Sequence, residues 1–416
     1  MNNPTAAPPA PARRSFAALQ HPGYRGFFFS FAAAMMADSI EHVISYWIMF
    51  QKFQSNALGA FAVVSHWLPF LLLSMPVGAL ADHFDPRRLI QIGMVIFMGV
   101  SVAWGVLFLT DTLEMWHAMA LLTLHGIAGV LWTPSSQVLL HHVVPAEHLQ
   151  SAVRLNATSR QLGMLGGPAI GGLLLMLFGP SHGILLNALI YIPTIIWLWR
   201  APYSRAAIGQ GPPRRALLSV SDVTSTLRRI AEHRSTLGAM IVLSGGASFF
   251  IGNAYLPQMP DFARSLGHGN ADLSYSVLLG ADAVGALTAG FILESRGWLQ
   301  PNPRTAMVLA ILWCVSLAGF AMSSMYSLAV ILLFVAGFMD LSFNSMAQTL
   351  VQLNAPADIR GRVLGVFSMM ALGLRTFSGV TVGLMGAVIG IHYSLALSAV
   401  ALIALTAVLL ARSSKQ

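Results

Sequence analysis

The sequence predicts an all-α membrane protein with twelve transmembrane helices in two pseudo-symmetric six-helix bundles. Three observations support this prediction. Only 9% of the 416 residues are charged, 56% are hydrophobic and the mean hydropathy is +0.69, whereas soluble domains carry about 25% charged residues. Twelve apolar stretches are long enough to cross the hydrocarbon layer, which takes about 20 helical residues. The second half of the chain also repeats features of the first.

Each apolar stretch is expected to be a helix because lipid gives the backbone no other hydrogen-bond partner. The expected spans of the first half are residues 27–50, 58–81, 89–110, 115–140, 153–178 and 183–199. Those of the second half are residues 237–259, 273–293, 305–322, 328–350, 363–388 and 393–410.

The longest polar interruption, residues 200–234, separates the two sets of six spans. It contains glycines, prolines and a short amphipathic stretch around residues 220–230, which is typical of a cytoplasmic linker. The Ala- and Pro-rich N-terminus is expected to be disordered. The predicted segments are a disordered N-terminus (1–26), a first bundle (27–200), a linker (201–235), a second bundle (236–411) and a tail (412–416).

The positive charges lie mainly on one side of the membrane. Most of the 23 lysines and arginines fall near the termini and the even-numbered hairpins, whereas Lys52 and Arg264 fall on the opposite side. By the positive-inside rule, both termini are expected in the cytoplasm. The net charge of +8 therefore reflects loops that border a lipid bilayer and does not indicate nucleic-acid binding.

The first span contains three ionisable residues, which are costly inside a membrane unless they face a cavity or a partner. Asp38 and His42 are four residues apart and share a helix face, with Glu41 three residues from Asp38. A carboxylate beside an imidazole can exchange a proton with it. These residues are the leading candidates for proton coupling or substrate contact. The alternative is a static pair that fixes the first helix.

A second polar stripe lies in the tenth span. Asp340, Asn344 and Gln348 recur every four residues, so they lie on one helix face that cannot comfortably face lipid. Asp340 is the second candidate for proton coupling, and Asn344 and Gln348 are candidates for substrate contact. An interhelical polar clamp is the alternative, because such contacts are common in membrane bundles.

Two arginines occupy near-equivalent positions in the fifth and eleventh spans. Arg160 lies near the cytoplasmic end, whereas Arg375 is deeper and must find a carboxylate, a carbonyl or an anionic substrate. His66 and His125 also lie within spans. A lone membrane histidine is more often a hydrogen-bonded packing residue than a proton carrier, so both are expected to be packing residues.

Glycines form a stripe along the fifth span. Gly163, Gly167 and Gly171 recur every four residues, next to Gly172, and allow another helix to approach closely. Pro168 adds a bend. The stripe predicts either tight packing alone or a pliable interface between the two halves.

The two halves align with a shift of 211 residues. The matching pairs are Gly126 and Gly337, Gln137 and Gln348, Pro145 and Pro356, Glu147 and Asp358, and Gly172 and Gly383. A loop motif also repeats, because Gly78 and Asp82 are echoed one residue further on by Gly290 and Glu294. Parallel repeats of this kind characterise one class of secondary transporters, with the substrate path between the halves.

These residues together resemble the major facilitator superfamily over essentially the whole chain. The segment 78–88, GALADHFDPRR, is similar to the signature loop of that superfamily, with Gly78, Asp82, Arg87 and Arg88 in the matching positions. The spacing of Gly163, Gly167, Pro168, Gly171 and Gly172 resembles the fifth-helix motif of drug–proton antiporters. Segments 132–137, 160–172 and 358–363 resemble a bacterial exporter branch that includes the enterobactin (siderophore) exporter and macrolide-efflux-like proteins.

The resemblance implies a secondary transporter that exports an amphipathic small molecule, such as a siderophore, drug or secondary metabolite, in exchange for protons and as a monomer. It also implies a central cavity lined by the first, fourth, seventh and tenth helices, across which the two polar stripes face each other. Asp282, in the eighth span, is then a candidate partner for Arg375. Uptake of a metabolite and a non-transporting receptor or assembly factor are the alternatives.

The repeat and the resemblance also predict a latch on the cytoplasmic side. Asp82 is expected near the start of the eleventh helix, beside Gly361 and the cations Arg360 and Arg362, where a helix N-terminus favours an anion. Glu294 is expected to do the same near Arg154.

Several classes of protein are disfavoured by what the sequence lacks. It has no Walker-type phosphate loop and no metal-ligand spacing. Its single cysteine, Cys314, excludes an intramolecular disulfide. No enzyme activity, cofactor or metal site is therefore expected.

Overall fold

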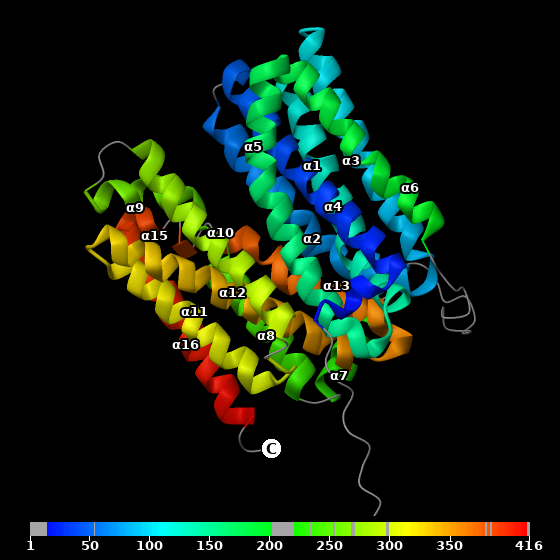
Figure 1. Cartoon of the computed structure of the whole chain (residues 1–416), viewed down its shortest axis with the longest axis vertical. Helices are drawn as coiled ribbons and strands as arrows, with labels where there is room; N and C mark the ends of the chain where they lie inside the picture. The colour runs from blue at the N-terminus through cyan, green and yellow to red at the C-terminus, as the bar shows by residue number, and fades with distance from the viewer. Residues whose placement is uncertain are drawn as a thin grey trace, which may run out of the picture.

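The computed structural model describes residues 15–413 except residues 54, 202–219, 233–234, 253, 268–270, 297–298, 379–380 and 383–384. The described part is helical throughout and contains no strand. Two bundles of six membrane passes lie side by side (Figure 1). The fold class predicted from the sequence is confirmed.

The first bundle is built from long helices joined by short turns. Its elements are α1 (Pro22–Phe53), α2 (Asn56–His83), α3 (Pro86–Leu109), α4 (Met115–Val143), α5 (Leu149–Ile190) and α6 (Ile192–Arg200). The Asp85 side chain caps α3 by accepting a hydrogen bond from the Arg87 N–H, and Pro86 occupies the first helical turn. α5 covers two passes because its backbone leaves the helical region at Gly179, which has φ of 71°.

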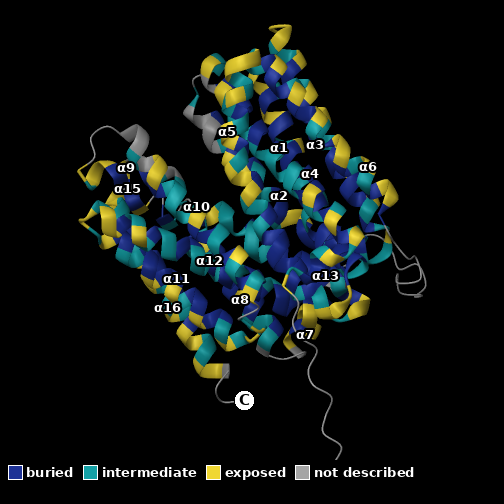
Figure 2. Cartoon of the chain, viewed as in Figure 1, coloured by how far each residue is buried: buried dark blue, intermediate teal, exposed yellow. Residues whose placement is uncertain are grey.

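The second bundle follows the linker helix α7 (Val220–Glu232). Its longer elements are α8 (Ser235–Phe250), α10 (Ala271–Arg296), α11 (Pro303–Met322), α12 (Tyr326–Asn354) and α16 (Ile391–Ser413). Shorter helices complete it: α9 (Met259–Ser265), α13 (Arg360–Ser368), α14 (Arg375–Ser378) and α15 (Met385–Ile389). Buried residues fill the interior of each bundle and the region of α13 (Figure 2).

Nine helices in the described part are long and apolar enough to cross a membrane, and residues 236–250 form a shorter apolar helix. The lower number has three causes. The seventh pass is this shorter helix, the fifth and sixth passes are joined at Gly179 into one stretch of 55 residues, and the eleventh pass is broken into short helices.

Two spans predicted as continuous helices are wrong in their extent. The seventh helix ends at Phe250 rather than near residue 259, because Gly252 takes a left-handed conformation with φ of 50°. The eleventh pass is interrupted by a π-helical turn, Met369–Gly373. A Cβ atom at Gly373 would lie 2.5 Å from Leu71 Cα, so close contact with α2 accompanies this interruption.

The predicted disorder of residues 1–26 is wrong from residue 15 onward. Residues Ala17–Gln20 form a 3₁₀ turn, and α1 begins at Pro22. The Ala18 N–H donates to Ser151 Oγ at 3.0 Å, and the Tyr24 hydroxyl donates to the Ala152 carbonyl at 2.7 Å. Contacts with α5 therefore order a segment whose composition alone indicates disorder.

The bundles touch closely near the ends that carry the chain termini. α2 crosses α13 where a Cβ on Gly78 would lie 2.1 Å from the Gly361 carbonyl oxygen. α5 crosses α10 where a Cβ on Gly290 would lie 2.1 Å from Thr158 Oγ1. Both crossings lie in the half of the molecule next to the linker and the termini, called here the termini side. Toward the opposite side the bundles diverge (Figure 1).

The glycine stripe of α5 packs inside the first bundle. A Cβ on Gly163 would lie 2.6 Å from Met35 Cβ, and one on Gly167 would lie 2.3 Å from Ser39 Cβ, both on α1. Gly171 also faces α1, at Ile40, whereas a Cβ on Gly172 meets nothing within 4 Å. The stripe is therefore a packing seam between α1 and α5, and its prediction as an interface between the halves is wrong.

Gly167→Val is expected to lower the thermal unfolding midpoint of the purified protein, because overpacking of a closed seam costs about 1–3 kcal/mol. Tryptophan fluorescence during heating in detergent measures the midpoint. Gly172→Val is the matched control, since the added side chain enters open space. Equal midpoints for the two variants would contradict the seam.

Candidate functional site

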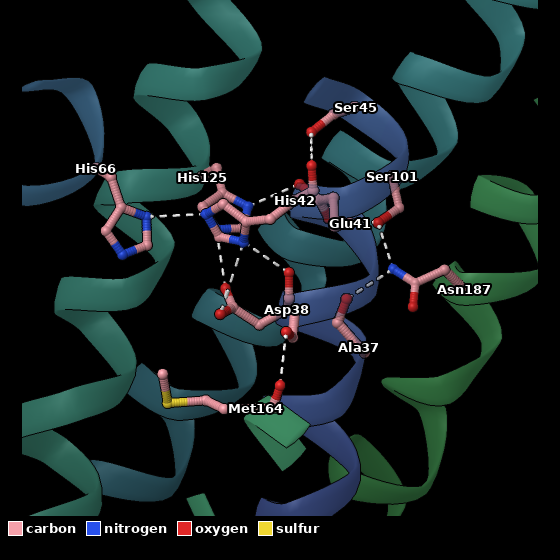
Figure 3. Close-up of polar contacts among 11 residues, drawn as sticks. Ala37, Asp38, Glu41, His42, Ser45, His66, Ser101, His125, Met164 and Asn187 are labelled. Carbon is pink, nitrogen blue, oxygen red and sulfur yellow. Dashed lines mark hydrogen bonds and ion pairs between the residues drawn. The ribbon is translucent and has the colours of Figure 1, made fainter. Parts of the chain in front are cut away.

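Three ionisable residues of α1 point into the first bundle (Figure 3). Asp38, Glu41 and His42 share one helix face because they are three and four residues apart. They meet His125 of α4 and His66 of α2. The sequence predicts the grouping on α1, and the fold adds the two histidines from other helices.

His125 lies between the two carboxylates. Its Nδ1 is 2.7 Å from Glu41 Oε1 and its Nε2 is 2.9 Å from Asp38 Oδ1. The Ser101 hydroxyl of α3 donates to Glu41 Oε2 at 2.5 Å. His125 and Glu41 are buried, so these contacts replace the water that both groups lose in the bundle interior.

His42 and His66 form the other half of this group. His42 Nδ1 lies 2.7 Å from the Asp38 carbonyl oxygen, and its Nε2 lies 3.2 Å from His66 Nδ1. His42 Nδ1 is 3.9 Å from Asp38 Oδ2, so their carboxylate–imidazole contact is longer than that of His125. A small cavity lined by His42, His66, His125 and Tyr46 adjoins them.

His66 and His125 are therefore not isolated, and their role as packing residues stays a prediction. Both belong to the same polar cluster as Asp38 and Glu41, here called the histidine cluster and defined as Asp38, Glu41, His42, His66 and His125. The sequence signal for this grouping is a polar residue at similar depth in three neighbouring spans. That signal becomes visible only once the helices are known to be adjacent.

The polar stripe of α12 faces the first bundle. The Asn344 amide donates to Asp340 Oδ1 at 2.7 Å and to its carbonyl oxygen at 3.1 Å. Asp340 is close enough to Arg375 and to Arg160 of α5 for electrostatic attraction. Gln348, the third member of the stripe, is half-buried. Asp340 thus lies between cations contributed by both bundles.

Arg375 connects the bundles at the same level. Its guanidinium lies over the Trp67 ring of α2, 5.0 Å from the ring centroid. Such a cation–π contact contributes about 2 kcal/mol when it is desolvated. Arg375 Nε is buried and has no hydrogen-bond partner among the described residues.

Asp282 is not the partner of Arg375. Its Oδ1 accepts a hydrogen bond from the Tyr255 hydroxyl at 3.4 Å. The acid that attracts Arg375 is Asp340. The Asp282 backbone packs against α12, since a Cβ on Gly337 would lie 1.9 Å from the Asp282 carbonyl oxygen.

On the termini side, Asp82 of α2 binds the start of α13. Its Oδ1 accepts a hydrogen bond from the Gly361 N–H at 2.5 Å, and its Oδ2 accepts one from the Arg362 N–H at 3.0 Å. Arg362 Nε lies 3.8 Å from the same carboxylate. Two unpaired N–H groups at a helix start favour an anion. The contact predicted by the repeat is present, and its gating role stays a prediction.

The arginines of the same loop act within the first bundle. Arg87 pairs with Asp85 at 2.8 Å and donates to the Ala201 carbonyl at 2.8 Å. Arg88 donates to the Gln91 side chain at 3.0 Å. These contacts fix the turn between α2 and α3, whereas Asp82 reaches the second bundle.

Glu294 of α10 makes the reciprocal contact. Arg154 of α5 places Nε 3.2 Å from Glu294 Oε2 and donates from Nη1 to the Leu293 carbonyl at 3.0 Å. The Ser151 hydroxyl also donates to Glu294. An acid from each bundle therefore binds the other bundle, and we call the Asp82 and Glu294 contacts the two clasps.

A further ion pair lies at the surface of the termini side. Arg229 of the linker helix donates to Asp358, and the guanidinium holds the pKa of this carboxyl below its usual range. The pair is largely exposed and contributes about 0–1 kcal/mol.

Because the folded pKa of Asp358 is depressed, the stabilisation by this pair is present above the unfolded pKa of about 3.9. It is lost only as the pH falls through the folded value. Arg229→Gln is therefore expected to shift the thermal unfolding midpoint equally little at pH 8 and pH 5.5. A large shift at pH 5.5 alone would contradict this assignment.

Comparison with known proteins places these features in context. The family described as "Transmembrane secretion effector" matches residues 13–415. The chain is 22% identical to the multidrug efflux pump Tap of Mycolicibacterium fortuitum over 376 residues, covering 88% of this chain and 89% of Tap. It is 20% identical to the staphyloferrin A transporter of Staphylococcus aureus over 388 residues, covering 92% and 94%.

Among solved structures, the fold is similar to that of the major facilitator superfamily transporter FucP in its outward conformation. The TM-score is 0.72 at 12% sequence identity, over 94% of this chain and 99% of FucP. At this identity the likeness concerns the fold alone.

Proposed function

Because the chain belongs to the transmembrane secretion effector family of the major facilitator superfamily, we propose that it exports an amphipathic small molecule by proton-coupled alternating access. The family is one of transporters and not of enzymes. The proposed substrate is a siderophore, a drug or a secondary metabolite. The drug-exporting and siderophore-transporting relatives support this class.

The observation that carries the proposal is the charge arrangement around Asp340. This half-buried acid attracts Arg375 of its own bundle and Arg160 of the other. Arg375 also stacks on Trp67 across the bundle interface. A change of charge at Asp340 therefore changes the attraction between the bundles, which is what coupling a proton to alternating access requires.

The carboxylates of the histidine cluster are placed differently. Asp38 and Glu41 lie beside one imidazole, His125, inside the first bundle. The geometry therefore favours Asp340 over Asp38, the reverse of the order that the sequence suggests.

In the proposed cycle, ionised Asp340 and the two arginines hold the polar part of a substrate, while Trp67 contacts its apolar part. A proton that arrives from the open side neutralises Asp340 and weakens this binding, so the substrate leaves. The bundles then rock to open the termini side, where the proton dissociates. We place both termini in the bacterial cytoplasm, so that the open side faces outward.

The test begins with identification of the substrate. Extracellular metabolites are compared between cells with and without the gene, under iron limitation and in rich medium. The compound that disappears from the medium is then offered to inverted membrane vesicles energised to acidify their lumen. Export predicts accumulation inside these vesicles and its loss when a protonophore dissipates the gradient.

Accumulation that survives the protonophore would overturn proton coupling. Accumulation by intact cells instead of inverted vesicles would show uptake. Tight binding of the compound without movement in either system would support a receptor.

A further inference from the structure

The histidine cluster brings three imidazoles together from three different helices. His42 of α1, His66 of α2 and His125 of α4 each offer a ring nitrogen, and these atoms all lie within 4.8 Å of one another. We infer that these histidines, with Asp38, bind one divalent transition-metal ion. The inference is independent of the proposed coupling at Asp340, because it concerns other residues and needs no transport.

The spacing of the nitrogens fits one ion. His42 Nε2 and His66 Nδ1 face each other at 3.2 Å. Two ligands in a tetrahedral zinc site, each about 2.0–2.1 Å from the metal, are about 3.3 Å apart. Only a small movement is therefore needed for both nitrogens to bind the same ion. The sequence spacing of 24 residues between them does not resemble a linear metal motif.

The neighbours of His42 and His125 favour the tautomers that a metal needs. His42 Nδ1 faces the Asp38 carbonyl oxygen at 2.7 Å. A carbonyl only accepts, so the proton lies on Nδ1 and the neutral ring has its lone pair on Nε2. His125 Nδ1 likewise faces Glu41 Oε1 at 2.7 Å. Metal-binding histidines usually donate their second ring N–H to a carbonyl or carboxylate in this way.

His125 Nε2 is buried and lies 2.9 Å from Asp38 Oδ1. One ion could bind both atoms together with the two other imidazoles. The result is three nitrogen ligands and one oxygen ligand, with Glu41 orienting His125.

The charges and the ligand types point to the same class of ion. Asp38 and Glu41 place two carboxylates inside the bundle, where unpaired charge costs several kcal/mol. A divalent cation offsets both charges. Imidazole nitrogens with one carboxylate suit zinc, cobalt, nickel, copper or ferrous iron, and do not suit calcium or magnesium. Tyr46 also lines the adjoining cavity and is 39% exposed.

The test uses the full chain in detergent, with any affinity tag removed and bound metal stripped by a chelator. Titration with Co²⁺ is followed by visible absorption, which is strong for four-coordinate cobalt. We expect saturation at one ion per chain and loss of the bands when Zn²⁺ is added. X-ray absorption of the zinc-loaded protein should show three imidazoles.

His66→Gln and His42→Gln should each weaken Co²⁺ binding at least about tenfold and alter the absorption bands. Even substitution of a residue that only hydrogen-bonds a metal ligand lowers metal affinity about 10–100-fold. His182→Gln is the matched control, because His182 is an exposed residue of α5 outside the cluster. Gel filtration and thermal unfolding check that each variant folds.

Three results would overturn the inference: no cobalt bands with the unaltered chain, equal binding by the His66, His42 and His182 variants, or fewer than three imidazoles around zinc. If the cluster variants fail to fold, the stoichiometry and imidazole count of the unaltered chain still decide. If the chain does not bind metal but exports its substrate in a proton gradient, the metal site is wrong and the proposed function is supported. If the chain binds metal but does not export, the proposed function is wrong and the metal site is supported.

Discussion

Asp340→Asn is expected to abolish export driven by a proton gradient while substrate exchange across the membrane continues. Asparagine keeps the shape of the side chain and its contact with Asn344, but it cannot ionise. The arginines of both bundles then lose an attraction that a proton normally switches. An ionisable group inside the membrane changes the free energy by several kcal/mol when its charge changes, and each 1.36 kcal/mol changes an equilibrium constant tenfold. The rate of gradient-driven export should therefore fall by at least about tenfold.

The measurement compares two assays in proteoliposomes. One follows net transport under an imposed pH gradient, and the other follows exchange of labelled for unlabelled substrate without a gradient. Asp111→Asn is the control, because Asp111 is an exposed carboxylate in a loop that pairs with Lys52. Gradient-driven transport that survives in Asp340→Asn but not in Asp38→Asn would move the coupling proton to the first bundle.

Asp82→Asn is expected to open the termini side. The carboxylate accepts two backbone hydrogen bonds at the start of α13. Hydrogen bonds to charged groups contribute about 1.5–3 kcal/mol, so the ratio of closed to open molecules should fall by roughly 10- to 150-fold. If the closed form of the unaltered protein exceeds the open form by a similar factor, the Asp82→Asn variant becomes a mixture of both forms.

Pulsed electron resonance between spin labels measures this change. Labels at Ala146→Cys and Ala357→Cys report the termini side, and labels at Thr112→Cys and Ser324→Cys report the opposite side; the four sites are exposed. Cys314, the single native cysteine, is buried and is replaced by alanine in all samples.

In Asp82→Asn the first label distance should lengthen and the second should shorten. Asp85→Asn is the matched control, because Asp85 belongs to the same loop but pairs within the first bundle. Unchanged distances in Asp82→Asn would refute the clasp as a gate.

The sequence predicts the twelve passes because lipid forces each long apolar stretch into a helix. It does not predict where the seventh and eleventh passes break, because those breaks depend on tertiary contacts such as that of Gly373 with Leu71. The Asp82 contact with Gly361 follows from the internal repeat, which relates positions in the two halves.

Contacts between helices that the internal repeat does not relate could not be predicted from the sequence. His42, His66 and His125 are far apart along the chain and meet only when α1, α2 and α4 pack. Asp282 shows the converse error: the sequence suggests a pair with Arg375, whereas its side chain contacts Tyr255. Helix existence depends on local composition, whereas the partner of a buried charge depends on packing geometry.

The two clasps are related by the pseudo-twofold relation between the bundles: Asp82 reaches from the first bundle to the second, and Glu294 reaches from the second to the first. One clasp alone would serve as a pivot about which the bundles could twist in the membrane plane. Two clasps on separate helix pairs resist that twist. Loss of one clasp therefore weakens the closed form and leaves the other clasp to hold it, which is consistent with a mixture of open and closed molecules in Asp82→Asn.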